Sequence, residues 1–304
     1  MKTYGLPYKG SKDKIAEKIC SLFPIKENFY DLFGGGGSIT HYQLLQNNYK
    51  HYIYNEYNPL VAKTFKMAIN GEFKNESRWI SHEDFDKLKN IDPYVAFCFS
   101  FGNDLKSYAY GREIEPYKKA LHYLIVFQDE SLMNKIFPNI DFSFVHNIKD
   151  VNDRRLKVKK VIDDLLATSD DNRVRSNESL QSLIQLESVQ RLANIERLVI
   201  YNKSYDEIEI KPNSVIYVDI PYSQTNKYEV SKDFDYEKFY DWCGKQTELC
   251  FISEYNMPSD RFTCIAEIEH RSIICATENQ KVVEKVFLPN HQVKDYKMPS
   301  IFDL

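Results

Sequence analysis

Residues 28–38 decide the fold and read Asn-Phe-Tyr-Asp-Leu-Phe-Gly-Gly-Gly-Gly-Ser. The apolar run over 28–33 predicts a short buried strand, and an apolar pattern of helical spacing continues from Ser38 through Leu45. Glycines at 34–37 join the two. Glycine permits positive φ and a close approach of the backbone to a ligand, and a helix N-terminus adds unpaired N–H groups and a partial positive charge. The pattern favours a ligand-binding loop at the carboxyl end of a strand, and a ligand-free flexible loop is the alternative.

Strand and helix patterns alternate on both sides of this stretch, which predicts a mostly parallel sheet with helical crossovers. The segments expected to form it are helices over 13–23 and 60–69 and strands over 51–54, 198–201, 214–218 and 250–253. Between them, residues of about 72–194 show mainly helical patterns. We therefore predict an α/β domain built from residues 1–74 and 196–304, with a mainly helical domain, residues 75–195, inserted into it.

Composition sets limits on the class of protein. The chain has 304 residues, 43% hydrophobic and 28% charged, which is typical of a folded globular protein. It has no apolar run of membrane-spanning length and does not begin with a secretory signal pattern, so we expect a cytoplasmic protein without a membrane partner. The six cysteines lack metal-binding spacing, which predicts reduced thiols and no metal site. The net charge of −4 means that any contact with nucleic acid must come from local basic patches.

An acidic residue follows the second predicted strand. Glu56 lies about twenty residues beyond the glycine loop, where a carboxylate can accept hydrogen bonds from ribose hydroxyls. An exposed glutamate at a strand end is also common. Together with the glycine loop, Glu56 suggests a cofactor that contains adenosine.

The most informative motif is Val-Ile-Tyr-Val-Asp-Ile-Pro-Tyr at residues 215–222. The apolar strand delivers Asp219 to the ligand-bearing edge of the sheet, and Pro221 restrains Ile220 to an extended conformation. A carboxylate, a backbone carbonyl and the ring of Tyr222 suit a planar ligand that carries an amine. The alternative is a strand that ends in a proline turn.

These motifs, in this order, resemble the Dam-type DNA adenine methyltransferases, particularly their phage and prophage members. Tyr-Lys-Gly-Ser-Lys at residues 8–12 is similar to the aromatic-x-Gly-small-Lys segment of that family, and residues 219–222 match its Asp-Pro-Pro-Tyr signature. Ile220 stands where the commonest form has proline, but the role implied for that position is a backbone carbonyl, which isoleucine also has.

The resemblance implies a Rossmann-like, S-adenosylmethionine-dependent methyltransferase fold with an inserted target-recognition domain. It implies methyl transfer to the N6 amine of an adenine flipped out of double-stranded DNA, with S-adenosylhomocysteine as the product. Catalysis is assigned to Asp219, Ile220, Pro221 and Tyr222. Cofactor binding is assigned to Tyr8, Lys12, Asp31, Phe33, Gly34, Gly35, Gly37, Ser38, Glu56, Ser204 and Asp219.

Basic and aromatic residues of the inserted domain are candidates for contact with DNA phosphates. They are Lys106, Tyr110, Arg112, Arg154, Arg155, Lys157 and Lys159. The alternative for each is a solvated helix face.

Other interpretations of the same motifs remain as alternatives. The pocket could serve RNA or a protein amide, or the chain could be a catalytically silent DNA-binding relative. A nicotinamide-dependent oxidoreductase is disfavoured because the chain has no Gly-x-Gly-x-x-Gly motif. For a DNA methyltransferase of this type, a restriction endonuclease is a further candidate partner.

Overall fold

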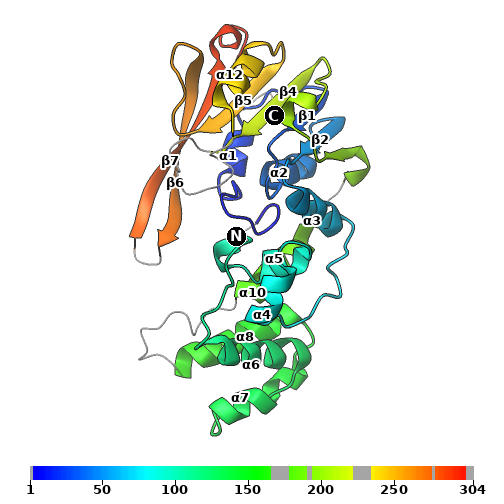
Figure 1. Ribbon diagram of the computed structural model, residues 1–304, viewed down its shortest axis with the longest axis vertical. Helices are drawn as coiled ribbons and strands as arrows, with labels where there is room; N and C mark the ends of the chain where they lie inside the picture. The colour runs from blue at the N-terminus through cyan, green and yellow to red at the C-terminus, as the bar shows by residue number, and fades with distance from the viewer. Residues whose placement is uncertain (1–2, 166–177, 190–193, 222–233, 276–277, 299–304) are drawn as a thin grey trace. The chain divides into compact units, whose positions relative to one another are not determined.

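The computed structural model describes residues 3–165, 178–189, 194–221, 234–275 and 278–298 (Figure 1). The chain forms two compact units, the first from residues 1–6, 10–69 and 191–304 and the second from residues 7–9 and 70–190. The predicted domain boundaries, 74/75 and 195/196, lie within five residues of the positions where the chain passes from one unit to the other, 69/70 and 190/191. The short segment 7–9 belongs with the second unit, where Tyr8 stacks on Phe97 and the Lys9 amide donates to the Asn103 carbonyl.

The first unit contains a seven-stranded sheet in the order β3-β2-β1-β4-β5-β7-β6. The first five strands of that order pair in parallel, and β7 pairs antiparallel with both β5 and β6. The strands are β1 (Asn28–Asp31), β2 (His51–Asn55), β3 (Leu198–Tyr201), β4 (Ser214–Asp219), β5 (Leu249–Glu254), β6 (Phe262–Cys275) and β7 (Glu278–Pro289). The predicted parallel sheet is therefore confirmed.

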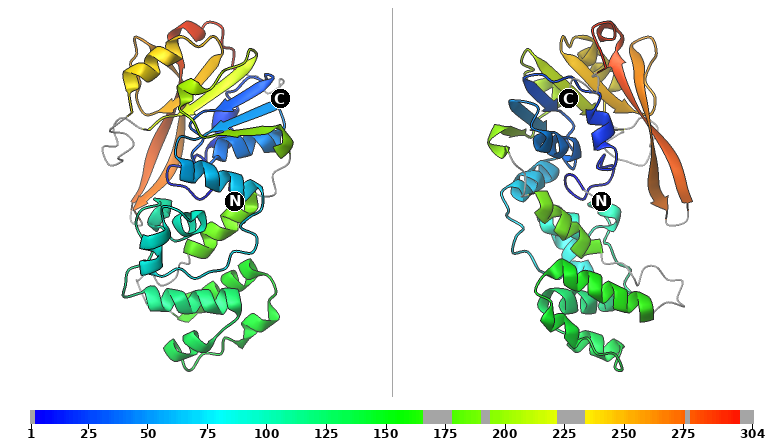
Figure 2. Two further views of the ribbon diagram at one scale, coloured as in Figure 1. Left: turned by 45° about the vertical axis from the view of Figure 1, so that its right-hand side comes forward. Right: turned by 180° about the vertical axis from the view of Figure 1, so that it is seen from behind.

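The hairpin formed by β6 and β7 was not predicted, and it is the longest paired element of the chain (Figure 2). β7 pairs with β5 only over Lys285, Val286 and Phe287, whereas its pairing with β6 continues to Glu278. Most of the hairpin thus lies beyond the edge of the parallel sheet.

The helices of the first unit cover both faces of the sheet. They are α1 (Ala16–Cys20), α2 (Ser38–Gln46), α3 (Pro59–Ile69) and α12 (Tyr236–Gly244), with short 3-10 turns η3 (Ile195–Arg197), η4 (Tyr205–Glu207) and η5 (Asn290–Gln292). α1 is shorter than the predicted helix over 13–23, because the backbone after Cys20 turns through i to i+3 hydrogen bonds.

The two faces follow from the alternation of side chains along the strands. Tyr30, Ile216 and Val218 belong to one apolar cluster with Phe239 of α12. The intervening residues Phe29, Tyr217 and Phe251 lie on the opposite face, where all three contact the ring of Phe23. The sheet is thus buried on both faces, as parallel sheets require.

The second unit is helical, as predicted, with one isolated β-bridge between Ser100 and Tyr108 among its described residues. Its helices are α4 (His82–Leu88), α5 (Pro93–Cys98), α6 (Glu115–Phe127), α7 (Ser131–Ile136), α8 (Val151–Leu165) and α10 (Glu178–Val189), with 3-10 turns η1 (Phe101–Asn103) and η2 (Ser143–Asn147). Leu124 of α6 and Val158 of α8 are buried in its apolar cluster. None of the helices in the described part of the chain is long and apolar enough to span a bilayer.

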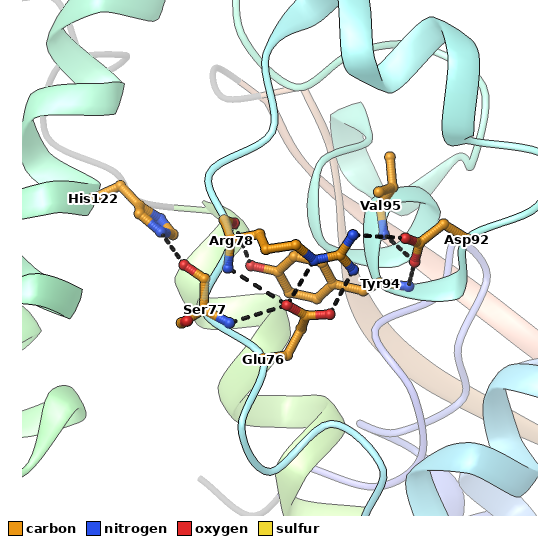
Figure 3. Close-up of polar contacts among 7 residues, drawn as sticks. All are labelled: Glu76, Ser77, Arg78, Asp92, Tyr94, Val95 and His122. Carbon is orange, nitrogen blue, oxygen red and sulfur yellow. Dashed lines mark hydrogen bonds and ion pairs between the residues drawn. The ribbon is translucent and has the colours of Figure 1, made fainter.

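A network of charged groups orders the segment that leads into α5 (Figure 3). The Arg78 guanidinium donates from Nε to Glu76 Oε1 at 2.9 Å and pairs with Asp92 Oδ2 at 3.0 Å. Asp92 also caps α5 by accepting from the Tyr94 amide, and the Tyr94 hydroxyl donates to the Arg78 carbonyl at 2.8 Å. One arginine therefore joins a helix cap to the preceding extended chain.

A second arginine joins α8 to the end of α6. The buried Arg154 guanidinium donates to the carbonyls of Ile125 at 2.6 Å, Val126 at 3.3 Å, Ile148 at 2.8 Å and Lys149 at 3.0 Å. Ile125 and Val126 lie in the last turn of α6, where carbonyls have no partner within the helix. Arg154 thus satisfies acceptors that burial would otherwise leave without hydrogen bonds.

We expect Arg154→Met to lower the free energy of unfolding by about 1–3 kcal/mol, because it leaves buried carbonyls unpaired. The matched control is Lys157→Met on the exposed side of the same helix, for which a change within about 0.5 kcal/mol is expected. Differential scanning calorimetry of both variants measures this difference. Equal losses would show that the guanidinium does not stabilise the end of α6.

Candidate active site

The glycine loop is closely packed on the side chains beneath it. A Cβ atom at Gly34 would lie 2.1 Å from the Tyr54 ring, and one at Gly37, where φ is +72°, would lie 2.3 Å from the Phe65 ring. Tyr54 and Phe65 stack on each other at 4.3 Å, and the Tyr54 hydroxyl donates to the Gly35 carbonyl. Two of the four glycines are therefore required by packing inside the protein, a reason that was not anticipated from the sequence.

The N-terminal segment lies against the same loop. The Leu6 amide donates to the Gly36 carbonyl at 2.6 Å, and the Lys12 amide donates to Ser38 Oγ at 3.2 Å. The Gly5 amide donates to His41 Nδ1 at 2.8 Å. Burial lowers the pKa of His41 to about 4, so this imidazole is neutral and can accept the hydrogen bond. These contacts bring Lys12 to the carboxyl end of the sheet.

Glu56 braces the glycine loop. Its Oε2 accepts from the Gly35 amide at 2.8 Å and its Oε1 accepts from the Asn58 amide at 2.7 Å. Burial raises the pKa of Glu56, and these backbone hydrogen bonds oppose the rise. Each carboxylate oxygen has a second lone pair, so Glu56 can still accept a hydrogen bond from a ligand hydroxyl.

Asp31, at the end of β1, accepts a hydrogen bond through one of its two carboxylate oxygens. Its Oδ2 accepts from Thr40 Oγ1 at 2.7 Å, whereas its buried Oδ1 has no hydrogen-bond partner among the described residues. Burial raises the pKa of Asp31 to about 7, the Thr40 hydrogen bond opposes the rise, and the charge of Asp219 adds to it. A buried acceptor without a partner is where a donor group of a ligand would be stabilised.

Asp219, at the end of the neighbouring strand β4, pairs with Lys12. Lys12 Nζ donates to both oxygens of Asp219, at 2.8 and 2.7 Å, and lies 3.9 Å from Glu284 Oε1 of β7. Burial lowers the pKa of Lys12, but the charges of Asp219 and Glu284 raise it by more, so the ammonium is held charged. The cluster therefore combines one cation with two carboxylates at the carboxyl end of the sheet.

The turn after Asp219 is held from α12. The Tyr236 hydroxyl donates to the Pro221 carbonyl at 2.7 Å, and the Ile220 side chain is buried in the cluster that contains Phe239. Isoleucine at position 220 therefore adds apolar contacts to the core. Tyr222 lies outside the described residues.

The other predicted cofactor residues have contacts of their own. Phe33 stacks on Tyr205 at 5.3 Å. Ser204 begins η4 with a capping box, in which its amide donates to Glu207 Oε2 at 2.9 Å and its side chain accepts from the Glu207 amide. Ser204 therefore has a structural role in the fold, and the cofactor contact predicted for it would be additional. Tyr8 belongs to the second unit.

The predicted DNA contacts divide into interior and surface residues. The Tyr110 ring is buried and its hydroxyl donates to Ser179 Oγ at 2.9 Å, while Arg154 caps α6 as described above. These placements favour structural roles for both, because a side chain enclosed by protein cannot reach a phosphate. The exposed candidates are Lys106, Arg112, Lys157 and Lys159, and Arg155 is partly exposed and donates to Asn152 Oδ1.

Five parallel strands in the order 3-2-1-4-5, followed by an antiparallel hairpin and with a glycine loop after β1, define a Rossmann-like methyltransferase fold. The chain belongs to the D12 class N6 adenine-specific DNA methyltransferase family, whose model matches residues 8–247. The protein is therefore an adenine-specific DNA methyltransferase, and the resemblance to the Dam-type enzymes is confirmed. No curated protein matches the chain.

Sequence reasoning missed two residues of this site, Tyr236 and Glu284. Tyr236 follows the residues that cap α12, and Glu284 lies in the hairpin that was not predicted. No short motif marks either residue, because their proximity to Asp219 and Pro221 arises from strand order and helix packing.

We expect Gly34→Ala to lower the free energy of unfolding by about 1–3 kcal/mol, because the added methyl overlaps the Tyr54 ring. The matched control is Gly244→Ala at the end of α12, where a Cβ would meet no atom within 4 Å. Thermal unfolding of the two variants measures the difference. A Gly34→Ala protein as stable as the control would contradict tight packing under the loop.

Asp31 predicts a specific dependence of stability on pH. Because its pKa is raised from 3.8 to about 7, the folded state keeps a proton between these values that the unfolded state loses. Its contribution to stability is thus complete below about pH 4 and is lost as the pH rises to about 7, by on the order of 4 kcal/mol. Asp31→Asn, which retains an acceptor for Thr40, should remove this slope. Parallel curves of unfolding midpoint against pH for the two proteins would contradict the assignment.

Proposed function

We propose that the protein transfers a methyl group from S-adenosylmethionine to the N6 amine of an adenine that is flipped out of double-stranded DNA. The observation that carries this proposal is the Asp219 carboxylate at the end of β4, paired with Lys12 and next to the glycine loop. A duplex base cannot reach such a site without leaving the stack.

The residues at the strand ends fit the cofactor. Asp31 Oδ1 is a buried acceptor that an ammonium group would satisfy, and Glu56 retains lone pairs for ribose hydroxyls. Lys12, Asp219 and Glu284 together carry a net charge of −1, which complements a sulfonium. When bound, S-adenosylmethionine supplies an electrophilic methyl group and leaves as S-adenosylhomocysteine.

Asp219 and the Ile220 carbonyl would act on the adenine amine. That amine is a weak nucleophile because its lone pair is conjugated with the ring. Two acceptors for its hydrogens favour a pyramidal nitrogen with the lone pair free to react, so catalysis consists of orientation and electrostatic stabilisation. We propose that the same Asp219 oxygen takes the proton as the nitrogen is methylated.

Tyr222 is proposed to stack on the extruded base. Base flipping costs a few kcal/mol, and stacking on an aromatic ring returns about 1–3 kcal/mol. For the duplex, we propose phosphate contacts by Lys106, Arg112, Lys157 and Lys159, with Arg155 as a further candidate, since these side chains reach solvent.

We expect Asp219→Ala to bind S-adenosylhomocysteine in titration calorimetry but to transfer methyl groups to DNA at least about a hundredfold more slowly. The control is Asp241→Asn, which changes an exposed carboxylate of α12 and should keep full activity. Labelled methyl transfer to DNA, RNA and protein in parallel tests the substrate class. Near-normal turnover by Asp219→Ala would refute the proposed role of the carboxylate, and transfer to RNA or protein in preference to DNA would refute the substrate.

A further inference from the structure

Glu284 is a buried carboxylate to which the mechanism above gives no role in the methyl-transfer step itself. Its side chain is 2% exposed, and it lies on β7 next to Lys285, the last residue that pairs with β5. Burying a carboxylate costs several kcal/mol unless a cation or hydrogen bonds compensate it. One cation near it is Lys12, whose Nζ is 3.9 Å from Glu284 Oε1.

Three separate parts of the first unit meet at this cluster. Lys12 comes from the N-terminal segment, Asp219 from β4 and Glu284 from β7. Exposure of the side chains rises from 2% at Glu284 through 7% at Lys12 to 20% at Asp219. The ammonium thus has a deeply buried carboxylate on one side and the more exposed, proposed catalytic carboxylate on the other.

Sharing of the ammonium between two carboxylates has a chemical consequence. A cation paired with Asp219 alone would withdraw more charge from its oxygens and weaken them as acceptors. A second carboxylate at 3.9 Å draws part of that interaction away, and it also helps the buried ammonium to remain charged. Asp219 is then held in place through both of its oxygens.

We propose that Glu284 is a positioning residue for methyl transfer, which acts by holding Lys12 so that Asp219 stays oriented toward the adenine amine. This inference rests on the proposed function of Asp219. It assigns to the base of the β6–β7 hairpin an influence on the chemical step that acts through Lys12.

The test begins with Glu284→Gln, which keeps the shape of the side chain and removes its charge. We expect kcat to fall about tenfold with KM for DNA unchanged, because the effect is on the orientation and charge of Asp219 and not on DNA binding. The matched control is Glu267→Gln, which removes an exposed carboxylate paired with Lys285 on the same hairpin and should leave both constants unchanged. A Glu284→Gln enzyme that behaves like this control would overturn the proposal.

A double-mutant cycle separates this role from simple packing. In Lys12→Met, Asp219 and Glu284 face each other without the cation, so adding Glu284→Gln should no longer lower kcat. It should also raise the unfolding midpoint by more than it does in the wild-type background. If Glu284→Gln lowers kcat and the midpoint equally in both backgrounds, the residue acts through packing and the proposal fails. The midpoint comparison decides the question even if Lys12→Met has no measurable activity.

The Asp219→Ala experiment keeps the two proposals apart. If Asp219→Ala is inactive while Glu284→Gln matches its control, only the positioning role is lost. If Asp219→Ala is active, the proposed function itself is wrong.

Discussion

The pairing of Lys12 with Asp219 is the interaction on which the site depends. It closes a loop of 207 residues between the N-terminal segment and the end of β4, and both oxygens of the carboxylate take part. An ion pair removed from water in this way adds little net stability, because desolvation offsets most of the attraction. What it determines is conformation: it fixes the Asp219 carboxylate where the strands of the sheet end.

The glycine loop is closely packed by other parts of the protein. It packs against the rings of Tyr54 and Phe65 and donates a hydrogen bond to Glu56. On the N-terminal segment, the Leu6 amide donates to its backbone and Gly5 lies close to it. Substitution of a glycine there is opposed by protein atoms before any ligand is considered. Such rigidity is what a site needs if catalysis relies on orientation and not on a covalent nucleophile.

The helical unit uses several of its cationic side chains for contacts within the protein. Arg78 joins the cap of α5 to the preceding chain, Arg154 satisfies the end of α6, and Lys118 is buried beside the Tyr110 ring and Glu178. A basic run in a sequence is therefore an ambiguous sign of DNA contact. In α8, helical periodicity turns Arg154 inward and leaves Lys157 and Lys159 exposed.

Local sequence determined the parallel sheet, the glycine loop between β1 and α2, the helical character of the insertion and the motif that ends in Asp219. Each depends on residues close together in the chain, through apolar periodicity and the conformational freedom of glycine. Only the tertiary structure decided that β6 and β7 form a long hairpin, that Tyr236 holds the Pro221 carbonyl, and that Lys12 lies between Asp219 and Glu284. These features depend on strand order and on contacts between distant segments. Their free energy comes from burial and charge pairing, which no short stretch of residues can reveal.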